Sequence, residues 1–224
     1  MIHPVARRCY RNRGNPRLLE EIPTSAVRIL DVGCGGGDNA RHLTERGHVV
    51  DGITLSPSEA GQAKKTCRQV WVHNLDNGLP KNLRPVYDAA VCSHVLEHLR
   101  QPEDLVRQLC RLLRPTGGSL YVALPNPFFY QNRWNLLRGK CRYEPSGLMD
   151  STHLRWFTFQ TGRELLEQSG FRIQSAKVEG SLPLAPLRRI FPGSWVACLD
   201  RWGCRQWPGL FGYQMIYTAR ARSR

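Results

Sequence analysis

The sequence predicts an α/β protein built on a doubly wound, mostly parallel seven-stranded sheet with an antiparallel last strand. Three observations predict it. Strand-like and helix-like segments alternate five times along residues 27–124, which is typical of repeated βαβ units. A glycine-rich turn at 33–37 follows the first of these strands. The run 87–93 is almost entirely apolar, as expected for a strand buried on both faces.

The individual elements follow from periodicity and from residues that favour helix ends. A short helix over 17–21 is ended by Pro23. Asp38 or Asn39 is expected to cap the helix that runs to about 46, and Gly47 to end it. Pro57 suits the first turn of a helix that opens at 56. The remaining expectations are strands over 27–32, 48–53, 69–73, 87–93 and 119–124, a helix over 102–113, an irregular segment over 125–158, a helix over 161–169, and closing strands over 171–179 and 212–219.

Composition narrows the class of protein. No uncharged apolar run reaches the 18 or so residues of a membrane span, and the basic N-terminus lacks the apolar stretch of a signal peptide, so a cytoplasmic protein is expected. The net charge is +14 and the sequence pI is about 9.9, but the basic residues are spread along the chain. Nucleic acid is therefore not expected as a partner. The eight cysteines form no C-x-x-C pair, which argues against a zinc ribbon.

The turn from Asp31 to Gly37 is the first candidate site. Its glycines allow a tight turn and close approach of a ligand to the backbone, and the free N–H groups of the following helix attract anions. The spacing Gly35-x-Gly37-x-x-Ala40 also fits a dinucleotide fingerprint, so an NAD enzyme is one alternative. It is weakened because no acid ends the second strand, where the ribose of that cofactor would need one.

The segment Leu30–Gly37 resembles the cofactor motif of class I S-adenosylmethionine-dependent methyltransferases. Three later segments resemble that family in the expected order: Tyr87–Leu99, Arg111–Leu120 and Asp150–Thr158. Asp150–Thr158 is similar to a motif of small bacterial methyltransferases grouped with ubiquinone- and methionine-pathway enzymes. The resemblance implies a Rossmann-like fold, S-adenosylmethionine as cofactor, and a single methyltransferase domain over 1–224.

The resemblance also implies a set of cofactor-binding residues. They follow the first four strands: Asp31, Gly33, Cys34, Gly35 and Gly37; Thr54 and Leu55; Asn74, Leu75 and Asp76; Ser93 and His94. Two of them depart from the family pattern, because Thr54 stands where an acid usually binds the ribose and Asn74 where an acid often lies near the adenine. Asp51 is expected to face elsewhere. These departures leave open a non-catalytic binding protein with a degraded cofactor site.

Histidines are the candidate catalytic residues. His94, His98 and His153 could deprotonate an acceptor hydroxyl, because histidine titrates near neutrality, and oxygen is favoured over nitrogen as the acceptor atom. The run His94-Val95-Leu96-Glu97-His98 also matches a zinc-peptidase pattern. Its position after a buried strand argues against that interpretation, so no metal is predicted, and a structural role for Glu97 is as well supported as a catalytic one.

Segments 125–158 and 182–210 are expected to act as lids over an acceptor site. The second is rich in Pro, Trp and Leu with Arg at intervals, which fits either a packed crossover or a surface resting on a membrane. The packed crossover is favoured, and peripheral membrane contact is left open. The acceptor is expected to be a small or lipid-linked molecule.

Overall fold

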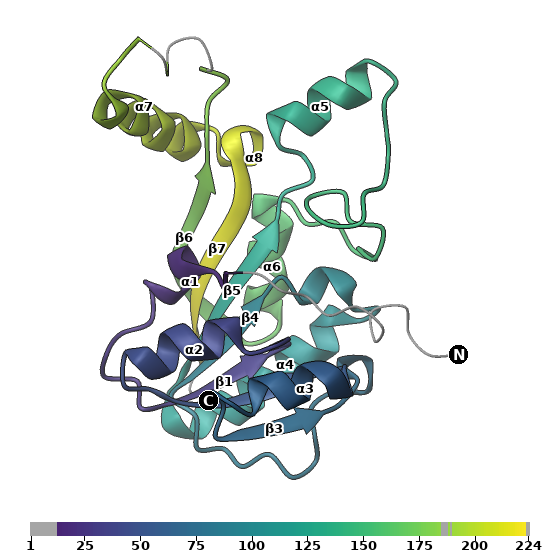
Figure 1. Ribbon diagram of the computed structural model, residues 1–224, viewed down its shortest axis with the longest axis vertical. Coiled ribbons are helices and arrows are strands. Elements are labelled where there is room, and N and C mark those ends of the chain that lie inside the picture. The colour runs from purple at the N-terminus through teal and green to yellow at the C-terminus, as the bar shows by residue number, and fades with distance from the viewer. Residues whose placement is uncertain (1–12, 185–187, 189, 223–224) are drawn as a thin grey trace.

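The computed structural model describes residues 13–184, 188 and 190–222. Within these residues, seven strands form one sheet in the order β3-β2-β1-β4-β5-β7-β6 (Figure 1). The strands are β1 (Arg28–Val32), β2 (Val49–Thr54), β3 (Gln69–Val72), β4 (Ala89–Ser93), β5 (Ser119–Pro125), β6 (Phe171–Gly180) and β7 (Gly212–Ala221). The predicted fold class is confirmed.

Strands β1 to β5 are parallel, and β7 lies antiparallel between β5 and β6. The order reverses at β1, which has β2 on one side and β4 on the other. In a parallel sheet this reversal opens a crevice at the carboxyl ends of the central strands, where ligands bind. The residues that follow β1, β2, β3 and β4 therefore meet at one edge of the sheet.

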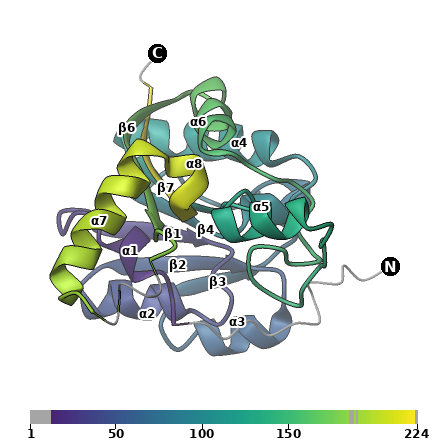
Figure 2. The same cartoon turned by 90° about the horizontal axis from the view of Figure 1, so that it is seen from above.

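Helices cover both faces of the sheet (Figures 1 and 2). On one face lie α1 (Pro16–Leu19), α2 (Asp38–Glu45) and α3 (Pro57–Ala63); on the other lie α4 (Pro102–Leu113) and α6 (Phe159–Gln168). Each face has its own apolar core. Leu30 and Val32 pack toward α4 and α6, whereas Ile29 packs toward α1 and α2, as the alternation of side chains along a strand requires.

Three further helices lie beyond the carboxyl ends of the strands: α5 (Tyr130–Leu137), α7 (Gly193–Gln206) and α8 (Pro208–Phe211). The expectation of a wholly irregular 125–158 is wrong, because α5 forms within it. No side chain of α5 is buried, so it carries no apolar stripe from which a helix could be predicted. Residues 1–12, and residues 185–187 and 189 of the predicted cover 182–210, lie outside the described residues.

Helix boundaries mostly follow the predicted signals. Ser56 caps α3 by accepting from the Glu59 N–H, and Gly47 follows the end of α2 with φ 87°. The predicted cap of α2 is wrong: Gly37, with φ 89°, is the capping residue, and Asp38 is the first helical residue. The chain has to turn through a left-handed conformation before it enters this helix, which glycine adopts without strain and aspartate does not.

Candidate active site

A cavity of about 460 Å³ opens at the carboxyl ends of β1 to β4. Its walls come from the turns after these strands, from the loop 146–153 and from the start of β7. Ten of the twelve predicted cofactor residues line it: Gly33, Cys34, Gly35, Thr54, Leu55, Asn74, Leu75, Asp76, Ser93 and His94. The candidate bases His98 and His153 line it as well, so the structure brings the two predicted groups together.

The turn after β1 requires glycine for two reasons. Gly33 and Gly35 have φ of 78° and 52°, the left-handed region. A Cβ atom on Gly33 would lie 2.4 Å from Cγ2 of Val95. The turn is fastened from the next strand, because the N–H groups of Gly33 and Cys34 both donate to the carbonyl of Ile53 at 2.8 Å. Gly37 does not line the cavity; it has the structural task of starting α2.

Asp31, the other predicted residue outside the lining, lies beneath the turn. Its side chain is fully buried, and neither carboxylate oxygen has a hydrogen-bond partner among the described residues. Burial raises the pKa of this carboxyl to about 7. An unsatisfied buried carboxylate beside a glycine cradle suits a ligand that brings a cationic amine, and the amino acid portion of S-adenosylmethionine carries one. The residues present therefore fit this cofactor.

A carboxylate lies beside the end of β2, but it comes from α3 and not from the strand. The Thr54 hydroxyl donates to Oε2 of Glu59 at 2.7 Å, and both side chains are buried at the cavity wall. Glu59 belongs to the first turn of α3. Asp51 faces away, as predicted: its carboxylate accepts from Arg68 and from the Tyr87 hydroxyl. A buried carboxylate, held against Thr54, thus lies beside the strand end where the family pattern has an acid.

After β3, polar side chains shape the cavity rim. Oδ1 of Asn74 accepts from the Asp76 N–H at 3.0 Å and caps a short helix, η2 (Leu75–Asn77). Oδ1 of Asp76 accepts from the Arg100 N–H at 2.9 Å. Both side chains therefore brace the loop, while Leu55 and Leu75 add apolar wall. Apolar walls with a few polar atoms at the rim suit a flat heterocycle such as adenine.

Directly after β4, His94 carries the one positive φ (54°) found at a non-glycine residue in the described chain. Its Nε2 lies 2.6 Å from Oε1 of Gln214, and the Gln214 amide nitrogen donates to Glu179, so His94 must be the donor. Its Nδ1 lies 3.4 Å from Oε1 of the buried Glu97. Partial desolvation would lower the pKa of His94, but the Glu97 carboxylate outweighs it, and the pKa is raised. His94 is therefore suited to donate protons rather than to take one.

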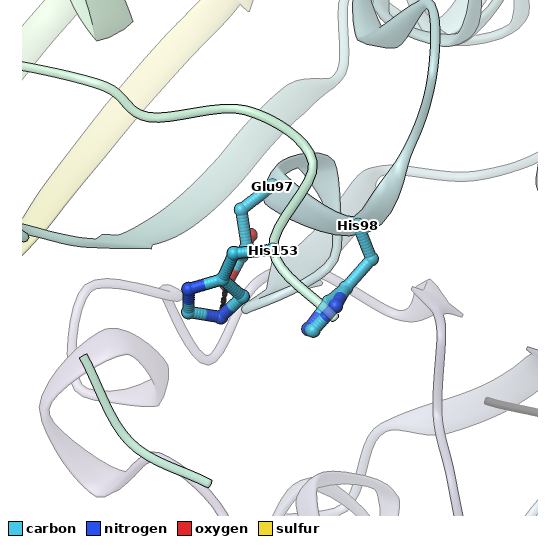
Figure 3. A group of neighbouring side chains, drawn as sticks. All are labelled: Glu97, His98 and His153. Carbon is cyan, nitrogen blue, oxygen red and sulfur yellow. Dashed lines mark ion pairs between the residues drawn. The ribbon is translucent and has the colours of Figure 1, made fainter. Parts of the chain in front are cut away.

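His153 has the opposite character. It reaches the cavity from the loop before α6, and its Nε2 lies 4.0 Å from Oε1 of Glu97 (Figure 3). Its side chain is only 6% exposed. Burial lowers the pKa of His153 more than the Glu97 carboxylate raises it, so the neutral ring is favoured. A neutral imidazole beside a carboxylate can accept a proton and have the resulting charge stabilised.

Glu97 is the centre of this cluster. It lies in a short 3-10 helix, η3 (Leu96–His98), so His94 and His98 do not share a helix face as the zinc-peptidase pattern requires. Burial would raise its pKa, but His94 and His98 lower it, and the carboxyl is held ionised. Ligand atoms of Glu97, His98 and His153 lie within 4.8 Å of one another, close enough to share a metal ion (Figure 3). The absence of a metal stays a prediction.

Sequence reasoning missed Glu59 and Gln214 as cavity residues. A signal for Glu59 was available, since Ser56-Pro57-Ser58-Glu59 begins a helix directly after β2 and places a carboxylate at the same edge of the sheet. Gln214 carried no signal, because it lies in β7, 120 residues after His94, and only the antiparallel pairing of β7 with β5 brings the two together.

Comparisons with known proteins agree with this geometry. Residues 3–176 match the model of a methyltransferase domain family. The ubiquinone biosynthesis O-methyltransferase of Chromobacterium violaceum is 35% identical over 126 residues, which are 49% of this chain and 51% of that protein. The corresponding enzyme of Bordetella avium is 31% identical over 136 residues, 52% and 54% of the two chains. The chain thus spans about half the length of the curated relatives it matches.

Solved structures share the fold. A SAM-dependent methyltransferase from Archaeoglobus fulgidus superposes with a TM-score of 0.65 at 21% identity, over 92% of this chain and 91% of its own. Magnesium protoporphyrin IX methyltransferase from Synechocystis, solved with bound SAH, superposes with a TM-score of 0.56 at 15% identity over 92% and 79%. With the family match, the glycine turn and the buried carboxylate beneath it, these findings show that the chain belongs to the methyltransferase-domain family of S-adenosylmethionine-dependent enzymes.

Proposed function

We propose that this protein transfers a methyl group from S-adenosylmethionine to a hydroxyl group of a small or lipid-linked acceptor. The observation that carries the proposal is the buried Glu97 carboxylate between a proton-donating His94 and a neutral His153, on the wall of the cavity that also holds the glycine turn. A neutral base in this position is what a hydroxyl acceptor requires and what a neutral amine acceptor needs less.

The turn 33–35, Asp31, Glu59 and the rim at 74–76 would hold the cofactor. Asp31 would offset the charge of its amino group, and the Glu59 carboxylate, oriented by Thr54, would accept hydrogen bonds from a vicinal diol such as a ribose. When bound, S-adenosylmethionine supplies a methyl group already activated by its attachment to a cationic sulfur. The protein then has to orient the acceptor, exclude water and receive one proton.

His153 is the residue we assign to that proton. The acceptor O–H bond breaks as the oxygen takes the methyl group, and the proton passes to the His153 ring. The Glu97 carboxylate, 4.0 Å away, stabilises the imidazolium that forms. His94 remains protonated, and its two N–H groups face Gln214 and the Glu97 carboxylate on the cavity wall. His153 and His94 therefore have different roles, while His98 helps to keep the Glu97 carboxyl ionised.

The names of the curated relatives support the choice of acceptor class, and the cavity lining indicates which segment contacts the acceptor. The curated relatives are named ubiquinone biosynthesis O-methyltransferases, which favours oxygen as the acceptor atom. The predicted lid 125–158 lines the cavity through Pro125, residues 146–148, Asp150 and His153. Among the described residues of 182–210 none lines it, so we assign acceptor contacts to the first segment.

Calorimetric titration with S-adenosylmethionine and with its demethylated product tests the cofactor proposal. Transfer of labelled methyl to a panel of phenols, aliphatic alcohols and matched amines then tests the acceptor atom. Micromolar binding followed by methylation of hydroxyl compounds is expected. Binding without transfer to any compound of the panel or of a cell extract would favour the non-catalytic alternative. That alternative rested on Thr54 and Asn74, and its first argument is weakened by the Glu59 carboxylate beside Thr54.

A further inference from the structure

Helices α5, α7 and α8 form a surface with exposed aromatic side chains, which we call the aromatic cap. It lies beyond the carboxyl ends of the strands, and the three helices are spread across this end of the molecule when seen from above (Figure 2). Its exposed apolar members are Trp134, Leu136, Leu137, Ile190, Phe191, Trp195, Leu199, Trp202 and Trp207. Soluble monomers rarely expose this many large apolar groups together, and such patches mark interaction sites.

The pattern along α7 shows that the exposure is organised. Trp195, Leu199 and Trp202 are spaced i, i+4, i+7 and are 65%, 47% and 51% exposed, so they form one stripe along the helix. A different side of α7 anchors it: Val196, Gly203 and Cys204 are buried, and a Cβ on Gly203 would lie 2.4 Å from Leu182. The helix is therefore packed on the protein through one side and presents a second apolar stripe to solvent.

Contacts between side chains and backbone connect the three helices of the aromatic cap. The rings of Tyr130 in α5 and Phe211 in α8 lie 6.2 Å apart, and Nη2 of Arg133 donates to the Gly209 carbonyl at 3.2 Å. The Asn126 amide, at the end of β5, donates to the carbonyls of Gly209 and Gly212. Trp202 and Trp207 contact edge to face at 5.5 Å, which links α7 to α8. The aromatic cap is thus one connected surface.

The charge on the aromatic cap selects its partner. Residues 130–144 and 190–211 contain six basic residues, Arg133, Arg138, Lys140, Arg142, Arg201 and Arg205, against two acidic residues, Glu144 and Asp200. Asp200 is already paired with Arg188 at 2.9 Å. Two copies packed through this face would bring like charges together. Apolar rings surrounded by arginines instead match the interface of an anionic bilayer, where rings enter the headgroup region and arginines meet lipid phosphates.

We propose that the aromatic cap docks this protein on the surface of a bilayer that contains anionic lipids. Docking would turn the lid side of the cavity toward the membrane. Pro125, which ends β5, and Tyr213, near the start of β7, both line the cavity, and the chain connects them to α5 and α8 through no more than a few residues. Docking itself does not depend on methyl transfer, whereas delivery of a lipid-linked acceptor to the cavity rests on the proposed function. The described residues contain no helix long and apolar enough to cross a membrane.

Co-sedimentation with vesicles tests the proposal. Vesicles of phosphatidylcholine alone are compared with vesicles that contain one third phosphatidylglycerol, using the full chain. Binding to the anionic vesicles is expected, with a blue shift of tryptophan emission. The triple variant W195S/L199S/W202S should weaken partitioning at least tenfold. The double variant R201E/R205E should weaken partitioning onto anionic vesicles, and the partitioning that remains should depend little on salt concentration. Matched controls at the opposite end of the sheet are Val27→Ser, an exposed apolar residue, and Arg172→Glu.

Circular dichroism melts establish that the variants fold. Equal partitioning of the wild type and the triple variant would overturn the proposal, as would failure of the wild type to bind either vesicle. Sedimentation equilibrium adds a further test: a wild-type dimer that the triple variant converts to a monomer would identify the cap as a subunit interface instead. Retention on single-stranded RNA that the triple variant loses, without vesicle binding, would also overturn it. None of these outcomes depends on methyl transfer, so the failure of docking is distinct from the failure of the proposed function.

Discussion

The Thr54 hydroxyl donates a 2.7 Å hydrogen bond to Oε2 of Glu59, which joins the end of β2 to the first turn of α3 at the cavity wall. The bond fixes the direction of a buried carboxylate that the strand itself does not provide. The family resemblance places an acid at Thr54, and the structure supplies the acid five residues later. Whether Glu59 serves in place of an acid at position 54 can be tested by mutation.

Glu59→Gln is expected to weaken binding of S-adenosylmethionine about 10- to 100-fold, because a hydrogen bond to a charged group contributes about 1.5–3 kcal/mol. Thr54→Val should weaken it less, since the carboxylate remains but loses its orienting donor. Titration calorimetry measures both. Glu45→Gln, an exposed glutamate on α2, is the matched control and should bind normally. Normal binding by Glu59→Gln would remove this residue from the site.

Asp31 makes the stability of the ligand-free protein depend on pH. Its pKa is raised from 3.8 to about 7 by burial, so between these values the folded protein retains a proton that the unfolded chain releases. The free energy of unfolding should therefore fall as pH rises from about 4 to about 7, by up to about 4 kcal/mol. Urea denaturation across this range measures the fall.

Asp31→Asn should flatten that dependence and abolish cofactor binding, because the amide cannot offset a cationic amine. The exposed Asp104→Asn serves as its control. Saturating S-adenosylmethionine should raise the melting temperature of the wild type more at pH 8 than at pH 5.5. Unfolding free energies of wild type and Asp31→Asn that run parallel across the range would contradict the assignment.

His153→Gln is expected to lower kcat about 10²- to 10⁴-fold, the usual contribution of a general base, while the dissociation constant of S-adenosylmethionine changes little. Because the pKa of His153 is lowered, the wild-type rate should fall only when pH drops below the ordinary histidine value, and this acid limb should vanish in the variant. Initial rates over pH 5 to 9 measure both effects. His42→Gln, on α2 outside the cavity, should leave the profile unchanged.

Gly33→Ala should destabilise the protein by about 2 kcal/mol or more. A left-handed alanine costs about 1–2 kcal/mol, and the new methyl group meets Cγ2 of Val95. Adding Val95→Ala should remove the steric share of the loss and leave the backbone share. Gly61→Ala, in open space on α3, is the control and should stabilise by up to about 1 kcal/mol. Thermal melts of these three variants and the wild type form the test.

Local signals predicted most of the fold and much of the site. Strand β4 was predictable because burial on both faces makes it uniformly apolar, and α3 because Ser56 and Pro57 favour a helix start. Gly33, Gly35 and the residues after β2 to β4 were predictable because the ends of parallel strands converge. Where the chain order sets the geometry, sequence reasoning succeeds.

Prediction failed where distant elements decide the outcome. Helix α5 buries no side chain, and α7 combines a small buried side with an exposed apolar stripe, so neither has simple amphipathic periodicity. The separate protonation preferences of His94 and His153 depend on Glu97 and Gln214, which only the folded chain brings to them. The role of Asp31 was implied by resemblance, but its burial without a partner became visible only in three dimensions.

The match to the methyltransferase domain family ends at residue 176, before α7, α8 and β7. The shared portion contains the glycine turn, Glu59, Glu97 and the three candidate histidines, whereas two of the three helices of the aromatic cap lie outside it. Most of the aromatic cap and most of the proposed catalytic and cofactor residues therefore lie on different stretches of the chain, although β7 adds Tyr213 and Gln214 to the cavity.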